Sequence, residues 1–393
     1  MSGAGFDVEA ARSRFSSLAS GFAFFDAPGG TQVPDEVGEA IAAALRDASG
    51  NLGAPYATGR AVEAILAGAE ADAARFLGCD PSEVAFGMNM TTLNFALSRA
   101  AGRDFAPGDE ILTTALDHDG GVAPWLELAA DKGLRVLVAD ATDEFTIDYD
   151  DLEAKLSERT RVVAFALASN ATGSVADARR ICRLAREAGA LSWIDAVHYA
   201  AHEPLDVSEL GCDVLLCSPY KFCGPHLGMA YLGHAQAERW RPYKVRPSPS
   251  TPLGRRFETG TLPYELLAGF RATIAYLDSL GGLARLREHE RSLGERFLAS
   301  LHAGVELYGP PGMEGRVPTF LVNLEGVDAA DAAHALAAEG IGVWYAESWY
   351  CVGLADRLPA RSLRIGLIHY NTAAEVERLS TALAALSQTT RAA

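Results

Sequence analysis

Short apolar runs alternate with segments of helical spacing between about residue 60 and residue 235 of the chain. Each run has the length of a single strand, and most are apolar at consecutive positions rather than at every second one. The runs are Val84–Phe86, Glu110–Thr113, Arg135–Val138, Val162–Ala166, Leu191–Ile194, Val214–Cys217 and Gly228–Leu232. Continuous apolar strands are typical of sheets buried on both faces, so the pattern predicts an α/β fold with a mainly parallel sheet.

Helical spacing follows some of these runs. Thr91–Arg99 and Ala176–Ala188 both carry apolar residues at helical intervals, and Gly189 is a natural C-cap for the second segment. The proline-rich stretch Arg241–Pro252 then predicts a loop, because proline continues neither a helix nor a central strand.

The pattern changes after this loop. Leu266–Leu280 and Leu283–Leu301 have the spacing of long helices, and strand-like and helix-like segments alternate from there to the end. The later segments are Phe320–Leu324, Ala329–Glu339, Leu363–Leu367 and Ala373–Leu386. We therefore predict a large domain over residues 21–265 and a smaller α+β domain over residues 266–393. Residues 1–20 are expected to pack on the smaller domain.

Charge and composition narrow the partners. Lys and Arg number 34 and Asp and Glu number 51, so the formal net charge is −17. That excess disfavours nucleic acid and anionic membranes, because both carry phosphates. We find no apolar run of about 18 residues, which a membrane span requires, and no signal peptide at the start. We expect a cytoplasmic protein with no membrane partner.

The six cysteines do not suggest a metal site. No two of them form a C-x-x-C pair, which disfavours zinc, and six in 393 residues do not make a disulfide framework. We expect no metal.

Two strand ends carry the residues with the most distinctive chemistry. Asp195 ends the run Leu191–Ile194, and Ser218 and Lys221 follow Val214–Cys217. Ligands of parallel sheets bind at the carboxyl ends of strands. A lysine in an apolar setting has a lowered pKa and is suited to a Schiff base. An acid that protonates a pyridine nitrogen, together with such a lysine, is what pyridoxal phosphate (PLP) requires. The alternatives are a lysine whose amine reaches water and an aspartate that caps a helix.

Other strand ends add candidates. Met90, Thr91 and Thr92 precede a helix and offer hydroxyls and backbone N–H groups to a phosphate. His118 is placed to stack on a flat ring, and Asn170 to hydrogen-bond a ring oxygen. Taken singly, each also fits an ordinary cap or loop residue.

Taken in order, these residues resemble the class V aminotransferase family of fold-type I PLP enzymes, and its cysteine desulfurase-like branch in particular. The likeness runs from FFDAPGGTQVP near the start to RIGLIHYNTAAEVERL near the end. Its most specific segments are SNATG, WIDAVHYAAH, SPYKFCGPHLG and RFETGTLP. The resemblance implies a large domain with a mainly parallel, seven-stranded type of sheet and a smaller C-terminal α+β domain.

The resemblance also implies roles around the cofactor. Lys221 matches the lysine that binds the PLP aldehyde and later moves protons at the substrate. Asp195 matches the partner of the pyridine nitrogen, and His118 the imidazole stacked on the ring. Asn170 and His198 match contacts to the ring's phenolic oxygen, where many relatives have glutamine in place of His198. The phosphate ligands are matched by Thr92 and Ser218, beside Thr91.

Further matches concern the substrate and a second subunit. Arg364, in SLRIGL, matches the arginine that binds the substrate α-carboxylate, a task that suits a guanidinium. The segment Ala27–Gly30, including Gly29, resembles a loop that lines the substrate pocket. Thr261 matches a phosphate contact from the neighbouring subunit, which implies a homodimer with shared active sites.

Two departures from the desulfurase pattern stand out. Tyr220 precedes the lysine where desulfurases have histidine. The segment that should hold the persulfide-forming cysteine reads VWYAESWYCVG, which is longer and richer in aromatic residues. Cys351 lies near the expected place, either as a nucleophile or as a small apolar residue packed beside Tyr350.

Three functions remain open from the sequence. The first is cleavage of the C–S bond of cysteine or an S-substituted cysteine, by desulfuration through Cys351 or by β-elimination, in a specialised pathway. Elimination fits the departures better, and the aromatic segment Trp344–Tyr350 suggests a substrate bulkier than cysteine. The second is transamination, epimerisation or decarboxylating deamination of another amino acid. The third is a non-catalytic α/β protein; a dinucleotide-binding G-x-G-x-x-G motif is missing. Nothing identifies a sulfur acceptor.

Overall fold

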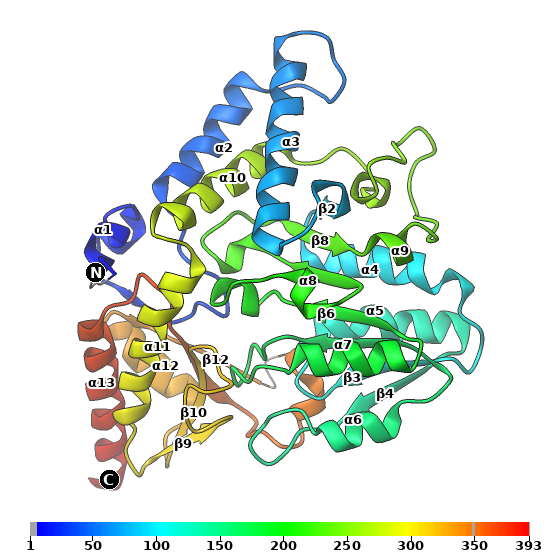
Figure 1. The fold of residues 1–393 in the computed structure, drawn as a ribbon. Coiled ribbons are helices and arrows are strands. Elements are labelled where there is room, and N and C mark those ends of the chain that lie inside the picture. Colours follow the sequence, from blue (N-terminus) through cyan, green and yellow to red (C-terminus); the bar gives the residue numbers. More distant parts are fainter. Residues whose placement is uncertain (1–5, 348–349, 393) are drawn as a thin grey trace, which may run out of the picture.

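The computed structural model describes residues 6–347 and 350–392, and a seven-stranded sheet forms the centre of its larger part (Figure 1). The order across this sheet is β2-β8-β7-β6-β5-β3-β4. The strands are β2 (Val84–Gly87), β3 (Glu110–Thr114), β4 (Arg135–Ala139), β5 (Thr160–Ala166), β6 (Leu191–Asp195), β7 (Val214–Cys217) and β8 (Gly228–Leu232). All seven apolar runs predicted from the sequence are therefore confirmed as strands.

The sheet is parallel except at one strand. β8 pairs antiparallel with both β2 and β7, whereas β7, β6, β5, β3 and β4 run parallel to one another. The parallel strands therefore end along one edge, where ligands of such sheets bind.

Helices cover both faces of this sheet, as continuous apolar strands require. On β5, Val162 and Ala164 belong to one core with Trp125, whereas Val163 and Phe165 belong to a second core. The helices on the two faces are α4 (Met90–Ala101), α5 (Asp119–Lys132), α6 (Tyr149–Lys155), α7 (Ala178–Glu187), α8 (Val207–Leu210) and α9 (His234–Ala237).

Three further helices form a layer beyond the β2 edge: α2 (Asp35–Asp47), α3 (Ala57–Leu77) and α10 (Tyr264–Ser279) (Figure 1). The predicted domain boundary at residue 266 falls inside α10. Because α10 packs on α2 and α3 through buried residues such as Leu267 and Phe270, it belongs with the large domain. The smaller domain starts with α11 (Leu283–Ala299).

The smaller domain is a four-stranded sheet with helices on it. Its strand order is β12-β13-β10-β9, and all three pairings are antiparallel. The strands are β9 (Val305–Tyr308), β10 (Thr319–Leu324), β12 (Trp344–Ala346) and β13 (Ser362–Gly366), and the helices include α12 (Ala329–Ala338) and α13 (Ala373–Ala392). Its own core contains Phe297, Phe320 and Leu379.

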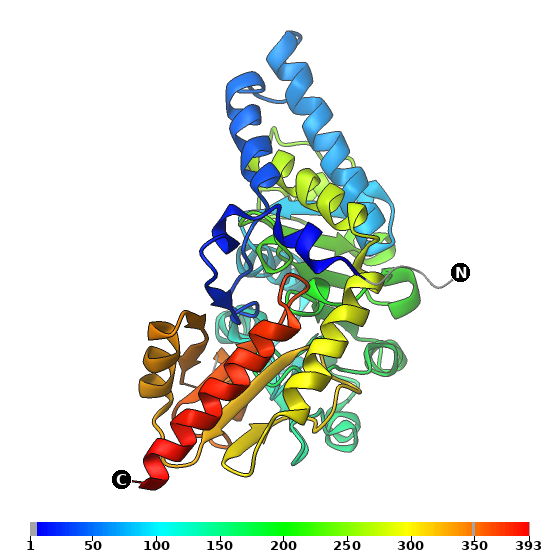
Figure 2. The same ribbon diagram turned by 90° about the vertical axis from the view of Figure 1, so that its left-hand side faces the viewer.

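The start of the chain joins the two parts (Figure 2). α1 (Val8–Arg12) contacts both the first turn of α13 and the loop before it. Arg12 pairs with Glu375 of α13 at 2.9 Å and donates to the carbonyl of Tyr370 in the loop. β1 (Ala23–Phe24) then pairs with β11 (Ile341–Gly342) of the smaller domain. In the described residues no helix is both long and apolar enough to cross a membrane.

Candidate active site

A cavity of about 220 Å³ lies at the carboxyl ends of β5, β6 and β7 and is closed on one side by β12 and β13. Polar groups from both domains converge on it. Ten of the residues predicted from the sequence line this cavity: Gly29, Thr91, His118, Asn170, Asp195, His198, Ser218, Lys221, Tyr350 and Arg364. They come from segments up to 335 positions apart (364 − 29).

Lys221 lies in the short helix η5 (Pro219–Lys221) just after β7 and is buried. Its amine donates to the carbonyl of Pro28 and, at 3.2 Å, to that of Gly29. Burial and, to a smaller extent, the neighbouring Arg364 guanidinium lower its pKa to about 7, while the charges of Asp26 and Asp195 act in the opposite direction. Much of this amine is therefore neutral near pH 7 and able to attack an aldehyde.

Asp195 is the last residue of β6, the strand next to β7. One of its oxygens accepts from the backbone N–H of Val197 at 2.9 Å. Burial raises its pKa to about 6, while the Val197 N–H and the charge of Lys221 act in the opposite direction. A buried carboxyl of this kind gains by meeting a cationic partner such as a protonated pyridine.

The N-terminus of α4 forms another wall of the cavity. Asn89 caps the helix, accepting from the N–H of Thr92 at 2.8 Å, and Ser218 accepts from the N–H of Met90 at 3.1 Å. Thr91 faces the cavity, whereas the Thr92 hydroxyl donates to Asn89 at 2.8 Å. A helix N-terminus with hydroxyls beside it suits a phosphate.

His118 caps α5, and its Nδ1 accepts from the N–H of Gly120 at 2.9 Å. The preceding Asp117 is buried and accepts 2.7 Å hydrogen bonds from the N–H groups of Thr114 and Ala166. Asp117 therefore ties the end of β3 to β5 and fixes where His118 lies. Burial lowers the pKa of His118 to about 4, so the ring is a neutral, flat surface over the cavity.

His198 and Asn170 also line the cavity. His198 is buried and its Nε2 lies 2.9 Å from the hydroxyl of Thr319 on β10. Burial and the nearby His202 hold the pKa of His198 well below its usual range. The neutral ring presents hydrogen-bonding nitrogens rather than a charge to the cavity.

Arg364 projects from β13 and is almost fully buried. Its Nη1 donates to the Asn170 carbonyl at 3.1 Å, and its Nη2 lies 3.2 Å from Oδ1 of Asp26. The guanidinium also lies over the ring of Trp344, 5.5 Å from the centroid. This is a fixed cation within the cavity, suited to a carboxylate.

The aromatic wall, which we define as the cavity-facing rings of Trp344 and Tyr350, lines the cavity from the smaller domain. The Tyr350 ring lies 5.3 Å from that of His118, at an angle of 27°. Both residues are exposed, at 44% for Trp344 and 62% for Tyr350.

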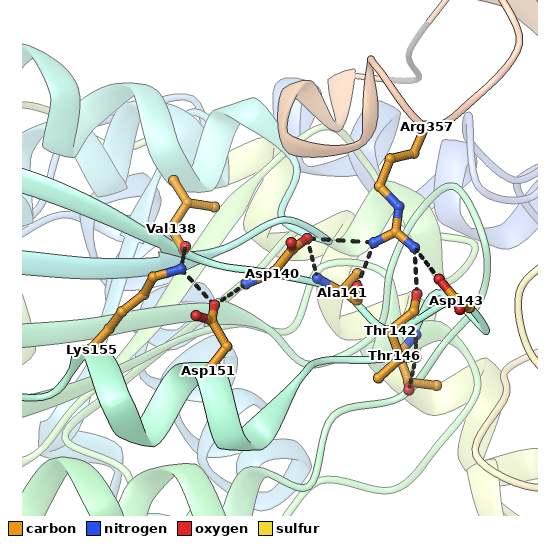
Figure 3. Close-up of polar contacts among 9 residues, drawn as sticks. All are labelled: Val138, Asp140, Ala141, Thr142, Asp143, Thr146, Asp151, Lys155 and Arg357. Atoms are coloured by element: carbon orange, nitrogen blue, oxygen red, sulfur yellow. Dashed lines mark hydrogen bonds and ion pairs between the residues drawn. The ribbon is translucent and has the colours of Figure 1, made fainter.

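The segment after the aromatic wall is anchored to the large domain (Figure 3). Arg357 donates to the carbonyls of Ala141 and, at 2.7 Å, Thr142, and lies 3.6 Å from the Asp143 carboxylate. Its guanidinium is 5.2 Å from the centroid of the Phe145 ring. Because hydrogen bonds to a charged group are stronger than neutral ones, Arg357 holds the base of the wall in place.

Cys351 follows the aromatic wall but is not among the described residues that line the cavity. Its side chain is fully buried. The thiol is 3.2 Å from the side-chain oxygen of Asn170 and 3.6 Å from the Leu116 carbonyl. Burial raises its pKa to about 12, so the thiolate needed for attack on sulfur is scarce near neutral pH.

Three other predicted residues lie outside this lining in the described chain. Ala27 is buried and is not part of the cavity lining. Thr261 is exposed in the loop before α10. Thr92 faces its own helix cap, as described above.

Sequence reasoning missed several residues that shape the site, notably Asp26, Asp117, Thr319 and Arg357. Asp26 stands directly before the predicted loop Ala27–Gly30, and Asp117 directly before His118, so adjacency was an available signal. Thr319 and Arg357 act through contacts with His198 and with residues 141–145, which no local pattern reveals.

Comparison with known proteins agrees with this geometry. The family model described as aminotransferase class-V matches residues 23–379. The chain belongs to the class V aminotransferase family. The members of this family are PLP-dependent enzymes, and the site fits that cofactor: Lys221, Asp195, His118 and the N-terminus of α4 surround one cavity.

The names of the relatives differ from one another. A probable cysteine desulfurase of Mycobacterium leprae is 33% identical over 334 residues, which cover 78% of each chain. An aminotransferase-like protein of Gibberella zeae is 30% identical over 400 residues, covering 98% of this chain and 99% of its own. The apo structure of a cysteine desulfurase from Thermococcus onnurineus superposes with a TM-score of 0.92 over 100% of both chains, at 24% identity, and shows the same fold.

Proposed function

We propose that this protein is a PLP-dependent β-eliminating lyase that cleaves the C–S bond of S-substituted L-cysteines. The observation that carries the choice of elimination is the full burial of the Cys351 thiol, which is not part of the cavity lining in the described chain and whose pKa is raised to about 12. Elimination needs no protein nucleophile at sulfur, whereas desulfuration needs a thiolate that reaches it.

Different residues of the cavity would bind the substrate, transfer the proton and hold the cofactor. Arg364 binds the substrate carboxylate, which places the Cα–H bond near the amine of Lys221. Asp195 would keep the pyridine nitrogen of PLP protonated, and Ser218 with Thr91 and the start of α4 would hold its phosphate. His118 would offer a flat surface to the ring, and His198 and Asn170 would offer hydrogen bonds to its phenolic oxygen. When bound, PLP withdraws the electron pair that remains on Cα once the proton is lost.

The bonds and protons balance without an added oxidant or reductant. Lys221 takes the Cα proton, the Cβ–S bond breaks, and its electron pair leaves with sulfur as a thiolate. The thiolate is protonated to a thiol, and the remaining 2-aminoacrylate reacts with water to give pyruvate and ammonium. The net reaction is S-substituted cysteine plus water to thiol, pyruvate and ammonia.

The aromatic wall supports a substituent on sulfur. Trp344 lies over the Arg364 guanidinium that would hold the carboxylate, and the Tyr350 ring lies against that of His118. A substituent that extends from sulfur toward this wall buries apolar surface against two aromatic rings, which favours binding over that of free cysteine.

We further propose that the protein works as a homodimer with shared active sites. Thr261, which matches a phosphate contact from the neighbouring subunit, is exposed in the loop before α10 rather than facing its own cavity. A cytoplasmic location stays a prediction from the sequence.

The proposal is tested by incubating the PLP-loaded protein with S-methyl-L-cysteine and S-benzyl-L-cysteine and measuring pyruvate and free thiol together. We expect equal amounts of the two products, with the higher kcat/KM for the benzyl substrate. Formation of alanine, of the D-enantiomer or of a 2-oxo acid that keeps sulfur would contradict elimination and favour desulfuration, epimerisation or transamination, respectively.

A further inference from the structure

Asp26, at the end of the segment that follows β1, is the carboxylate partner that the structure gives to Arg364. Their closest side-chain atoms are 3.2 Å apart, and the Arg364 side chain is only 3% exposed. A guanidinium buried to this degree is costly unless a negative charge lies beside it. Before substrate binds, Asp26 supplies that charge.

The same residue begins the turn that holds the amine of Lys221. The N–H groups of Gly29 and Gly30 donate to the Asp26 carbonyl at 2.9 and 3.1 Å, and the Pro28 and Gly29 carbonyls accept from Lys221. A Cβ added to Gly29 would lie 2.1 Å from an Asp26 carboxylate oxygen, so the carboxylate is pressed against the turn. Asp26 therefore touches both the arginine and the backbone that orients the lysine.

Asp26 reaches solvent by a route that avoids the main cavity. Its side chain is 34% exposed and lines a neighbouring cavity together with Gly30, Thr31 and His226. The two cavities share Gly29 and Tyr220 as a dividing wall. A proton can therefore reach the Asp26 carboxylate from water while substrate fills the main cavity.

We infer that Asp26 is a positioning residue that neutralises Arg364 in the resting protein and takes up a proton from solvent when a substrate carboxylate binds to Arg364. The inference rests on the proposed role of Arg364. Two carboxylates on one guanidinium repel each other, and protonation of Asp26 removes the repulsion while keeping its hydrogen-bonding shape. Arg364 is thus never left buried without a counter-charge.

The surroundings of Asp26 are consistent with this exchange. Burial raises the pKa of its carboxyl above the usual value, whereas Arg364, Lys221 and the N–H of Gly29 lower it. An arriving carboxylate competes for Arg364 and moves the pKa of Asp26 further up. The charged and titratable groups that face Asp26 are Arg364 from β13, Lys221 and Tyr220 from η5, Tyr370 after β13, and His226 across the neighbouring cavity.

The test is calorimetric and does not depend on turnover. The PLP-loaded protein is titrated with 3-(benzylthio)propanoate, which has the substrate's carboxylate and sulfur substituent but no amine to react. Titrations in two buffers of different ionisation enthalpy give the number of protons taken up. For the unchanged protein we expect net proton uptake on binding and an affinity that rises as pH falls.

Asp26→Asn should bind the analogue with no proton uptake from this position and with an affinity that changes less with pH, whereas Asp26→Glu should retain part of the uptake. Equal uptake by the unchanged protein and by Asp26→Asn would overturn the inference. Binding of the analogue that does not change with pH in the unchanged protein would also overturn the inference. This measurement does not depend on the folding of any variant. Loss of analogue binding in Arg364→Lys, together with no proton uptake by the unchanged protein, would refute only the role of Asp26. Unaltered binding in that variant would refute the carboxylate site itself, and this inference with it.

Discussion

The two sides of the cavity are built differently. On the sheet side, Asp195, Ser218 and Lys221 stand at or just after the ends of adjacent strands. On the other side, Trp344, Tyr350 and Cys351 come from a short strand and irregular backbone of the smaller domain. The sheet side carries the groups that fit PLP, and we propose that the opposite side binds the substrate. We infer from this difference that cofactor binding and the choice of reaction depend on different parts of the chain.

Anchoring distinguishes the second side further. The backbone after the aromatic wall is held by Arg357 and by burial of Leu354 and Leu358 on the large domain. A Cβ added to Gly353 would lie 2.6 Å from the Cα of Ala115, so the two backbones are in close contact there. A thiol in such a segment does not swing to a substrate sulfur without breaking these contacts.

The largest expected effect lies on the sheet side. Lys221→Ala removes the proton acceptor and the covalent attachment of PLP, so kcat/KM should fall by about 10³-fold or more. Absorbance of the dialysed protein checks attachment and a pyruvate assay checks rate. Retention of both the chromophore and the activity would contradict the role of Lys221.

A substitution of Arg364 tests whether this residue binds the substrate carboxylate. Arg364→Lys keeps a positive charge but loses the planar fork, which should cost about 1.5–3 kcal/mol of transition-state binding, or about 10- to 150-fold in kcat/KM. Steady-state kinetics with S-benzyl-L-cysteine measures it. An unchanged kcat/KM would place the carboxylate elsewhere.

Arg357 tests whether the anchor of the aromatic wall matters for the substituent. Arg357→Ala should lower kcat/KM for S-benzyl-L-cysteine by about 2- to 10-fold, the worth of an aromatic contact, with a smaller change for S-methyl-L-cysteine. Arg361→Ala is the matched control, since Arg361 lies on the same segment but pairs at 3.6 Å with the exposed Glu347. Equal losses for both substrates would assign Arg357 to general stability.

A smaller effect concerns pH. Because the Lys221 pKa is lowered to about 7 and the neutral amine attacks, capture of PLP by the cofactor-free protein should quicken as pH rises and level off above about pH 8. Arg364→Gln removes a charge that lowers this pKa, so the plateau should move to higher pH. Stopped-flow absorbance records both profiles, and identical profiles would show that Arg364 does not influence Lys221.

The sequence predicted the sheet side well, because strands buried on both faces leave a continuous apolar pattern and their ends carry the polar residues. Lys221, Asp195 and Ser218 could be found in this way, and the family resemblance added Arg364 and His198. The sequence pattern does not show which domain α10 belongs to, because α10 looks like any long helix until its packing on α2 and α3 is seen. Asp26 and Arg357 escaped prediction because their partners, Arg364 and residues 140–143, lie 338 and at least 214 positions away (364 − 26; 357 − 143). The burial of Cys351 likewise follows from a contact with Asn170 across the fold.

The separation of cofactor binding from reaction choice is tested most directly by the products formed from L-cysteine itself. The PLP-loaded protein and its Cys351→Ser variant are incubated with L-cysteine, and alanine and pyruvate are measured by mass spectrometry. We expect pyruvate and sulfide from both proteins. Their rates should agree within about threefold, because Cys351 is not among the described residues that line the cavity. If the unchanged protein forms alanine and Cys351→Ser does not, Cys351 is the sulfur acceptor. That result would contradict β-elimination.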